Sequence, residues 1–166
     1  MDKHLFFICP TDYLEVIINN TFDKESYFCT ALGNSVAFNP KTIEYIIGLL
    51  ESEKIRAITF ILSDDNEIIH NALYHKDLPK INRLVNLYDT IKYQKNRISL
   101  LIRKKDILPL FVSFHLNFKI TELKKRLKEA WFSDEIEINA KVYNRKTQKF
   151  FHLESNNFKR ECFYLN

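Results

Sequence analysis

Short apolar runs alternate with amphipathic segments along most of the chain. Three runs have the length and composition of buried strands: 4–9, 26–32 and 56–62. Segments with apolar residues at helical spacing lie between and after these runs: 12–19, 40–50, 67–74, 79–91 and 120–131. The helix that starts at Pro40 has the clearest signal, because Asn39 can cap it and proline favours the first turn. Strands separated by helices predict a parallel sheet with helices on both faces.

The second half of the chain is less regular. The segment 97–102 fits either a fourth parallel strand or the start of a helix, because its length does not decide between them. Pro109 interrupts the pattern, and the very apolar segment 110–118 is expected to be largely buried. Residues 136–153 alternate between apolar and polar, turn at 144–148 and return, which predicts a hairpin.

These elements predict one α/β domain over residues 1–166, with a mostly parallel central sheet flanked by helices and a C-terminal β-hairpin. A chain of 166 residues has the usual length of a single domain, and no repeat or linker divides it. Since 46% of the residues are hydrophobic, the chain can bury a sizeable core without disulfides to brace it.

The composition narrows the classes of function. Gly33 and Gly48 are the only glycines, so the chain has no glycine-rich loop of the kinds that cradle phosphates. The three cysteines are odd in number and show no spacing pattern, which argues against a disulfide framework. No signal-peptide pattern follows Met1, and no apolar run is long enough to span a membrane. We therefore expect a soluble protein of the cytoplasm, with no membrane partner.

The charge is mildly basic, with a net value of +4 and an isoelectric point near 8.9. Basic residues gather at 103–105 and along 119–128, but no aromatic RNA-binding motif accompanies them. The simpler interpretation is a solvated helix surface, so nucleic acid is not the expected partner.

Polar residues follow the third predicted strand: Ser63, Asp64, Asp65 and Asn66. In an open α/β sheet, ligands bind beyond the carboxyl ends of the strands. The residues that follow the first two predicted strands would reach the same edge of the sheet. The predicted pocket therefore consists of eight residues: Cys9, Asp12, Gly33, Asn34, Ser63, Asp64, Asp65 and Asn66.

Several roles are open to these side chains. Cys9 precedes a predicted helix start, which would lower the pKa of a reactive thiol, but a small buried residue at a strand end is the simpler interpretation. Asp64 and Asp65 can cap the next helix, bind a cation, or act as acid and base, and capping is the simplest of these roles. Farther along, His115 lies in an apolar segment and suits a core position.

The order of these motifs resembles that of the β-class carbonic anhydrases. In that family a first strand ends in C-x-D-x-R, a second in an R-N-A-G-N-like turn and a third in H-x-x-C, and a later edge strand carries V-x-G-W-x-Y-x-x-x-T-G-x-L. The corresponding segments occur here in the same order: 8–12, 31–34, 58–66 and 138–150. The last segment keeps Tyr143 and Thr147 at the family's spacing. The resemblance implies the carbonic-anhydrase fold and a dimer.

The zinc-binding residues of the family are mostly missing. Cys9 fits the position of one ligand, but the family's histidine falls on Ser63 and its second cysteine on Asn66. The family's Asp and Arg after the first cysteine fall on Thr11 and Tyr13. Zinc in proteins is held by cysteine, histidine or carboxylate, and serine and asparagine are poor substitutes. We therefore expect no metal and no other cofactor.

The nearby carboxylates do not restore the metal site. Asp12 lies one residue beyond the position of the family's Asp, and in a turn a shift of one residue directs a side chain elsewhere. A ligand set of Cys9, Asp64 and Asp65 would mix soft and hard donors and would contain no histidine. Without a metal to acidify bound water, hydration of CO2 lacks its nucleophile.

The sequence thus favours a carbonic-anhydrase-like protein without zinc and without that activity, which acts as a binding or structural protein. The alternative is an enzyme of different chemistry, whose pocket would use Cys9, Asp12 and Asp64 or Asp65. A small-molecule ligand is compatible with both hypotheses.

A homodimer is also expected. The resemblance implies it, and the 14 Phe and 8 Tyr residues are more than a small core hides. The surplus lies in 110–118 and in the tail, at Phe158, Phe163 and Tyr164. A two-fold interface would bury such patches on both copies at once. The opposing interpretation is that 110–118 is the central helix of the monomer core.

Overall fold

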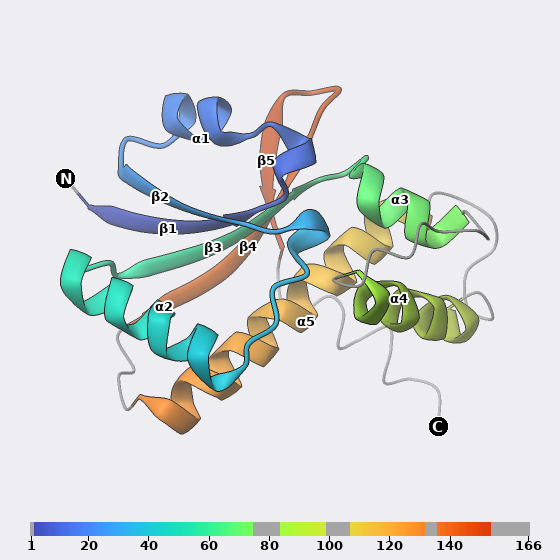
Figure 1. Ribbon diagram of the computed structural model, residues 1–166. Coiled ribbons are helices and arrows are strands. Elements are labelled where there is room, and N and C mark those ends of the chain that lie inside the picture. The colour runs from blue at the N-terminus through green and yellow to red at the C-terminus, as the bar shows by residue number, and fades with distance from the viewer. Residues whose placement is uncertain (1, 75–83, 99–106, 132–135, 154–166) are drawn as a thin grey trace.

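The computed structural model describes residues 2–74, 84–98, 107–131 and 136–153 (Figure 1). These residues form strands, α-helices and two single 3-10 turns, η1 and η2. In chain order the elements are β1 (Lys3–Ile8), η1 (Pro10–Asp12), α1 (Glu15–Thr21), β2 (Glu25–Thr30), η2 (Leu32–Asn34), α2 (Pro40–Glu53), β3 (Ala57–Ser63), α3 (Glu67–Tyr74), α4 (Val85–Ile98), α5 (Ile107–Ala130), β4 (Glu137–Asn144) and β5 (Lys149–His152).

The strands form one sheet in the order β2-β1-β3-β4-β5. β1 pairs in parallel with β2 and β3, β3 pairs in parallel with β4, and β5 runs antiparallel to β4. The central strands β1 and β3 are buried on both faces, which explains their largely apolar sequences. The predicted α/β class, with a mostly parallel sheet and a C-terminal hairpin, is confirmed.

Two hydrophobic clusters lie on opposite faces of the sheet. The larger one packs between the sheet and helices α2 and α5, which share one face in Figure 1. Within it, Phe7 and Phe60 stack with their ring centroids 4.7 Å apart, and Phe38 meets both rings edge-on. The smaller cluster joins α1 to the other face through Phe6 and Ile18. Phe6 and Phe7 are neighbours in β1, so their side chains point to opposite faces, as the pleat requires.

The helix α2 starts where the sequence predicts it. The Asn39 side chain accepts a hydrogen bond from the backbone N–H of Thr42 at 3.0 Å. Pro40 occupies the first turn, where its missing N–H leaves no helical bond unmade. The sequence signal and the structure agree here because both depend on local contacts alone.

The helix predicted over 12–19 begins later than expected. The turn η1 ends at Asp12, and Tyr13 then adopts a left-handed conformation with φ of 54°. A left-handed residue cannot continue a right-handed helix, so α1 begins only at Glu15. The resulting turn places Asp12 at the carboxyl end of β1.

The expectation that Pro109 interrupts the helical pattern is wrong. Pro109 lies in the first turn of α5, where backbone N–H groups have no helical acceptor and proline costs little. The apolar segment 110–118 therefore continues without a break into the basic amphipathic part of the same helix.

The first half of α5 belongs to the monomer core. Phe111, Val112 and Leu116 are buried in the larger cluster, as the opposing interpretation of 110–118 holds, while Phe118 is 46% exposed. Although α5 has 24 residues, neither it nor any other described helix is long and apolar enough to cross a bilayer.

Some predictions fall on residues that the structure does not describe. Of the ambiguous segment 97–102, residues 97 and 98 form the end of α4, and the other four lie outside the described residues. The basic residues 103–105 and the tail from 154 onward lie outside them as well.

Candidate functional site

The carboxyl ends of β1 and β3 meet around a buried carboxylate, that of Asp12. Its Oδ2 accepts a hydrogen bond from the backbone N–H of Ser63 at 2.9 Å. Its Oδ1 accepts from the Ser63 hydroxyl at 2.5 Å and from the side-chain amide of Asn66 at 2.9 Å. Asp12 is only 1% exposed, and Ser63 and Asn66 are fully buried. The turn η1 is thereby joined to the end of β3 and to the start of α3.

Asn66 uses both ends of its side-chain amide. The nitrogen donates to Asp12, and the oxygen accepts the backbone N–H of Ile69 at 3.0 Å, which caps α3. The capping role that the sequence suggests for Asp64 and Asp65 therefore belongs to Asn66. The reason is its position, directly before the first residue of α3.

Arg145, in the turn between β4 and β5, closes this group from the outside. Its Nη2 donates to the backbone carbonyl of Asp12 at 3.0 Å and lies 3.5 Å from the Asp12 carboxylate. Its Nε donates to Asp65 at 2.7 Å. Beside it, the Asn144 side chain and the Arg145 backbone N–H donate to Asp64 at 2.7 Å and 3.3 Å. Both acidic residues after β3 are therefore bound to the hairpin turn.

The surroundings of Asp12 act on its pKa in two directions. Burial, the larger effect, raises the pKa of the carboxyl above its ordinary value. The hydrogen bonds from Ser63 and Asn66 and the charge of Arg145 oppose this rise, because they stabilise the ionised form. A buried carboxylate of this kind is costly unless its partners are in place.

The Cys9 sulfur is hydrogen-bonded to the turn η2. It accepts the backbone N–H of Gly33 at 3.0 Å and lies 3.0 Å from the Thr11 hydroxyl. Gly33 has a φ of 59°, and a Cβ at this position would come within 2.9 Å of Ile68 Cγ2, so glycine is required. Cys9 itself is fully buried, which places its thiol out of contact with solvent.

Asn34 bridges the two central strands. Its side-chain nitrogen donates to the carbonyls of Phe7 and Ile61 at 3.2 Å and 3.0 Å. Its φ of 53° lies in the left-handed region, which asparagine adopts more readily than most residues. The side chain is fully buried, so this contact holds β1 and β3 together at their carboxyl ends.

The residues at this edge of the sheet do not fit a zinc ion. Across the part of the chain that the structure describes, no three His, Cys, Asp or Glu side chains gather closely enough to hold a metal. Ser63 and Asn66, which stand where the resemblance places two ligands, are neutral and already bonded to Asp12. Hydroxyl and amide groups are also poor zinc ligands.

The structure brings only some of the eight predicted pocket residues into contact with one another. Six are buried, Asp64 is half-buried and Asp65 is exposed. They form separate hydrogen-bonded groups. Cys9 is paired with Gly33, and Asp12 with Ser63 and Asn66. Asp64 and Asp65 accept hydrogen bonds from the hairpin turn, and Asn34 donates to the strand backbones.

Arg145 and Asn144 also belong to the site, although neither is among the eight residues of the predicted pocket. Both lie in the predicted hairpin turn, and β4 runs parallel to β3. The turn after a parallel strand lies at the carboxyl edge of the sheet, so its position was the signal that pointed to these two residues.

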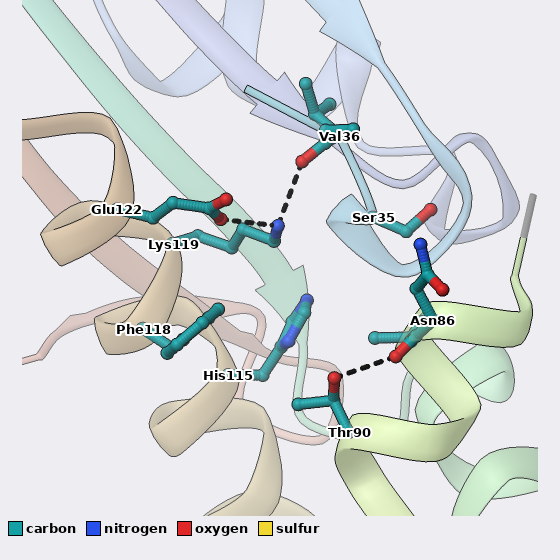
Figure 2. A pocket seen from close by; sticks show the side chains of 10 residues that line it. Ser35, Val36, Asn86, Thr90, His115, Phe118, Lys119 and Glu122 are labelled. Atoms are coloured by element: carbon teal, nitrogen blue, oxygen red, sulfur yellow. Dashed lines mark hydrogen bonds and ion pairs between the residues drawn. The ribbon is translucent and has the colours of Figure 1, made fainter. Parts of the chain in front are cut away.

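A cavity of about 220 Å³ lies between the segment 35–37, which follows η2, and the helices α4 and α5 (Figure 2). None of the eight predicted pocket residues lines it. Its described lining consists of Ser35, Val36, Ala37, Asn86, Leu87, Thr90, His115, Phe118, Lys119 and Glu122.

Three titratable side chains of α5 line this cavity: His115, Lys119 and Glu122. His115 donates through Nε2 to the carbonyl of Gly33 at 2.8 Å, since a carbonyl can only accept. Burial, helped by the nearby Lys119, lowers the pKa of His115 to about 4, so the ring is neutral at physiological pH. Lys119 is 8% exposed and donates to the carbonyl of Val36 and to Glu122, both at 2.9 Å.

The chain has the fold of the β-class carbonic anhydrases. The β-carbonic anhydrase CafD of Aspergillus fumigatus is 18% identical and gives a TM-score of 0.73, covering 93% of this chain and 90% of that one. The Coccomyxa β-carbonic anhydrase, solved in complex with acetazolamide, is 15% identical with a TM-score of 0.70, covering 98% and 82%. A tetrameric β-carbonic anhydrase from Sordaria macrospora is 14% identical with a TM-score of 0.69, covering 92% and 80%.

This likeness concerns the fold. No model of a sequence family and no curated protein matches the chain. The predicted resemblance to β-class carbonic anhydrases is thus confirmed at the level of the structure. An enzyme of different chemistry at the predicted pocket is not favoured, because Cys9 and Asp12 are buried and bonded within the protein.

Proposed function

We propose that this protein is a zinc-free, non-catalytic binding protein built on a β-carbonic-anhydrase-like fold. The observation that carries the proposal is the Asp12 carboxylate, which binds Ser63 and Asn66 with three hydrogen bonds. These two side chains stand at the positions where the resemblance places metal ligands. Here they serve as partners of a carboxylate instead.

The chemistry of the site supports this proposal. A zinc ion at Ser63 and Asn66 would have to displace the hydrogen bonds to Asp12 while gaining only neutral oxygen or nitrogen ligands. The one matching thiol, Cys9, is bonded to the backbone of Gly33. Without a metal-bound hydroxide, the site offers CO2 no strong nucleophile.

Purified protein is expected to contain far less than one zinc per chain and to hydrate CO2 no faster than buffer alone. The test is elemental analysis after expression in zinc-supplemented medium and dialysis, followed by a stopped-flow hydration assay. A β-carbonic anhydrase such as the Coccomyxa enzyme, treated identically, serves as the positive control. About one zinc per chain, or hydration above the buffer rate, would contradict the proposal.

We also propose a reducing compartment, the cytoplasm, as the working location. Cys9 and Cys29 are free thiols, and neither belongs to a disulfide among the described residues. Free thiols of this kind persist where glutathione and thioredoxin keep cysteines reduced.

A homodimer in solution is the assembly that we propose. The Sordaria macrospora enzymes of the same fold are tetrameric. In this chain, large side chains around η1 and α1 remain on the surface of the monomer, with Tyr13 78% and Val16 69% exposed. A two-fold contact would cover such residues on both copies.

Light scattering coupled to gel filtration is expected to give a mass about twice the 19.9 kDa of the chain. Tyr13→Ser combined with Val16→Ser would shift the mass towards that of the monomer if this surface forms the contact, and Tyr45→Ser, at another exposed position, is the matched control. A monomer mass for the unaltered chain at all micromolar concentrations would contradict the dimer.

A further inference from the structure

The cavity between η2, α4 and α5 is large enough to hold more than water. Its volume of about 220 Å³ far exceeds the roughly 10–15 Å³ that a single water molecule needs by a comparable measure. Figure 2 shows Lys119 and His115 of α5 on one side of it and Ser35 and Asn86 on the other. Polar groups from separate elements therefore converge on one small volume, which is the usual pattern of a ligand site.

Lys119 has an unused hydrogen-bond donor at this cavity. Its ammonium carries three N–H groups, and two of them bind Val36 and Glu122. Among the described residues, no oxygen or nitrogen accepts the third, although the ammonium also lies 5.3 Å from the centroid of the Phe38 ring and 5.9 Å from that of Phe118. Because Lys119 is largely buried, an acceptor from a ligand would gain more here than at a solvated lysine.

Glu122 offers the complementary group. Its side chain is 28% exposed and lies at the cavity, and Oε2 accepts from Lys119. The second oxygen has no donor within the described part of the chain, so it can accept a hydrogen bond from a ligand. The cavity therefore presents one cationic donor and one anionic acceptor next to each other.

The charge balance favours a ligand without net charge, and the adjacent cationic donor and anionic acceptor favour a zwitterion among such ligands. Lys119 and Glu122 neutralise each other, and His115 is uncharged at physiological pH. A simple anion would leave a net negative charge in a partly buried site, and a simple cation would leave a net positive one, both of which are unfavourable. A ligand with a carboxylate beside an ammonium group matches both charges and keeps the site neutral.

We propose that this cavity binds a small zwitterionic amino acid. Its carboxylate would accept the third N–H of Lys119, and its ammonium group would donate to Glu122. The Thr90 hydroxyl donates to the backbone carbonyl of Asn86 at 2.7 Å, so toward a ligand it would act as an acceptor, and the side chains of Ser35 and Asn86 add polar groups at the rim. The inference rests on the proposed function of a binding protein, and it names the ligand.

The remaining wall of the cavity suits an apolar side chain. Val36, Leu87 and Phe118 line it, and Phe118 keeps much of its ring exposed. An aliphatic amino acid would cover this apolar surface while its charged end meets Lys119 and Glu122. We therefore expect aliphatic amino acids to bind more tightly than glycine.

Calorimetric titration of the full chain with the standard amino acids, one at a time, tests the proposal. At least one aliphatic amino acid is expected to bind with a Kd below about 10 mM, which is weak but measurable. Its analogue without the amine and its analogue without the carboxylate are each expected to bind at least about tenfold more weakly. Failure of every amino acid to bind, or equal binding of either analogue, would overturn the inference.

Glu122→Gln is the informative variant, because it removes the charge opposite the ammonium group and leaves the amide in its place. It is expected to weaken amino-acid binding by about tenfold or more without weakening the amine-free analogue. Asp89→Asn, an exposed change on α4 outside the cavity lining, is the matched control. Thr90→Phe, which fills the cavity from a half-buried position, provides a second test and is expected to abolish binding. Unchanged affinity in either Glu122→Gln or Thr90→Phe would contradict the site.

The two proposals fail in different ways, because the cavity contains none of the residues at the metal-ligand positions. A sample that binds zinc and also binds an amino acid would disprove the zinc-free function while leaving the cavity inference intact. A zinc-free sample that binds no amino acid would disprove the inference alone. Zinc content and titration are therefore measured on the same preparation.

Discussion

Replacement of Asp12 by alanine is expected to lower the free energy of unfolding by about 3–5 kcal/mol. The change removes the acceptor for the Ser63 N–H, the Ser63 hydroxyl and the Asn66 amide, all of which are buried. It also removes one of the two carboxylates near Arg145, which keeps its ion pair with Asp65. Urea unfolding followed by circular dichroism measures the loss. Asp23→Ala, at an exposed position with no buried partner among the described residues, is the matched control and is expected to change stability by less than about 0.5 kcal/mol.

The isosteric variant Asp12→Asn separates the charge from the shape. Because burial raises the pKa of Asp12 in the folded state, the folded protein holds this proton more tightly than the unfolded chain does. The unaltered protein should therefore lose stability, relative to Asp12→Asn, as the pH rises from below 3.8 through the raised pKa. The opposite slope would mean that the hydrogen bonds outweigh burial. Equal stability of Asp12→Ala and the unaltered protein at neutral pH would contradict the role of the carboxylate.

The double substitution Ser63→His and Asn66→Cys is expected to create a zinc site. With Cys9 it supplies three ligands of the types that zinc prefers, at the positions that the resemblance assigns to them, and Asp12 adds a nearby carboxylate. The expected result is about one zinc per chain by elemental analysis, against far less than one in the unaltered protein.

The matched control for the zinc experiment is Ser63→Ala with Asn66→Ala, which disturbs the same two positions without adding ligands. Since histidine is larger than serine in a fully buried position, the designed variant can lose stability without metal. Refolding with and without zinc then provides the measurement, because metal binding to the folded state adds to its stability. A folded double variant that takes up no zinc would contradict the assignment of Ser63 and Asn66 to the ligand positions.

The main elements of the fold could be predicted because their signals are local. The apolar runs of β1 and β3 reflect burial on both faces, and the cap at Asn39 involves contacts within four residues. Pro109 shows the limit of this reasoning. Whether a proline interrupts a helix or stands in its first turn depends on where the helix begins. Asp106 directly precedes the first residue of α5 and is of a type that favours a helix start, so it was the signal that could have placed Pro109 in the first turn.

The position of the candidate site could be predicted from the sequence, but its hydrogen bonds could not. The polar residues after the third predicted strand indicated that Ser63 and Asn66 lie at the edge of the sheet, and the structure places them there. The partner of both, Asp12, lies at the end of the turn η1, and its bonds to residues 51 and 54 positions away have no local signal in the sequence. Lys119 was read as part of a solvated helix face, yet it is buried against the segment after η2, a contact between residues far apart in the sequence.

The bond between Arg145 and Asp12 joins residues 133 positions apart, and the bond between Ser63 and Asp12 joins residues 51 positions apart. We expect these contacts to form after β1, β3 and β4 have paired, because they join residues at the carboxyl ends of strands that must first be brought side by side. Interactions absent from the folding transition state leave the folding rate nearly unchanged and slow unfolding. The hydrogen bonds of the Asp12 carboxylate should therefore slow the unfolding of the protein, and they should have little effect on its folding rate.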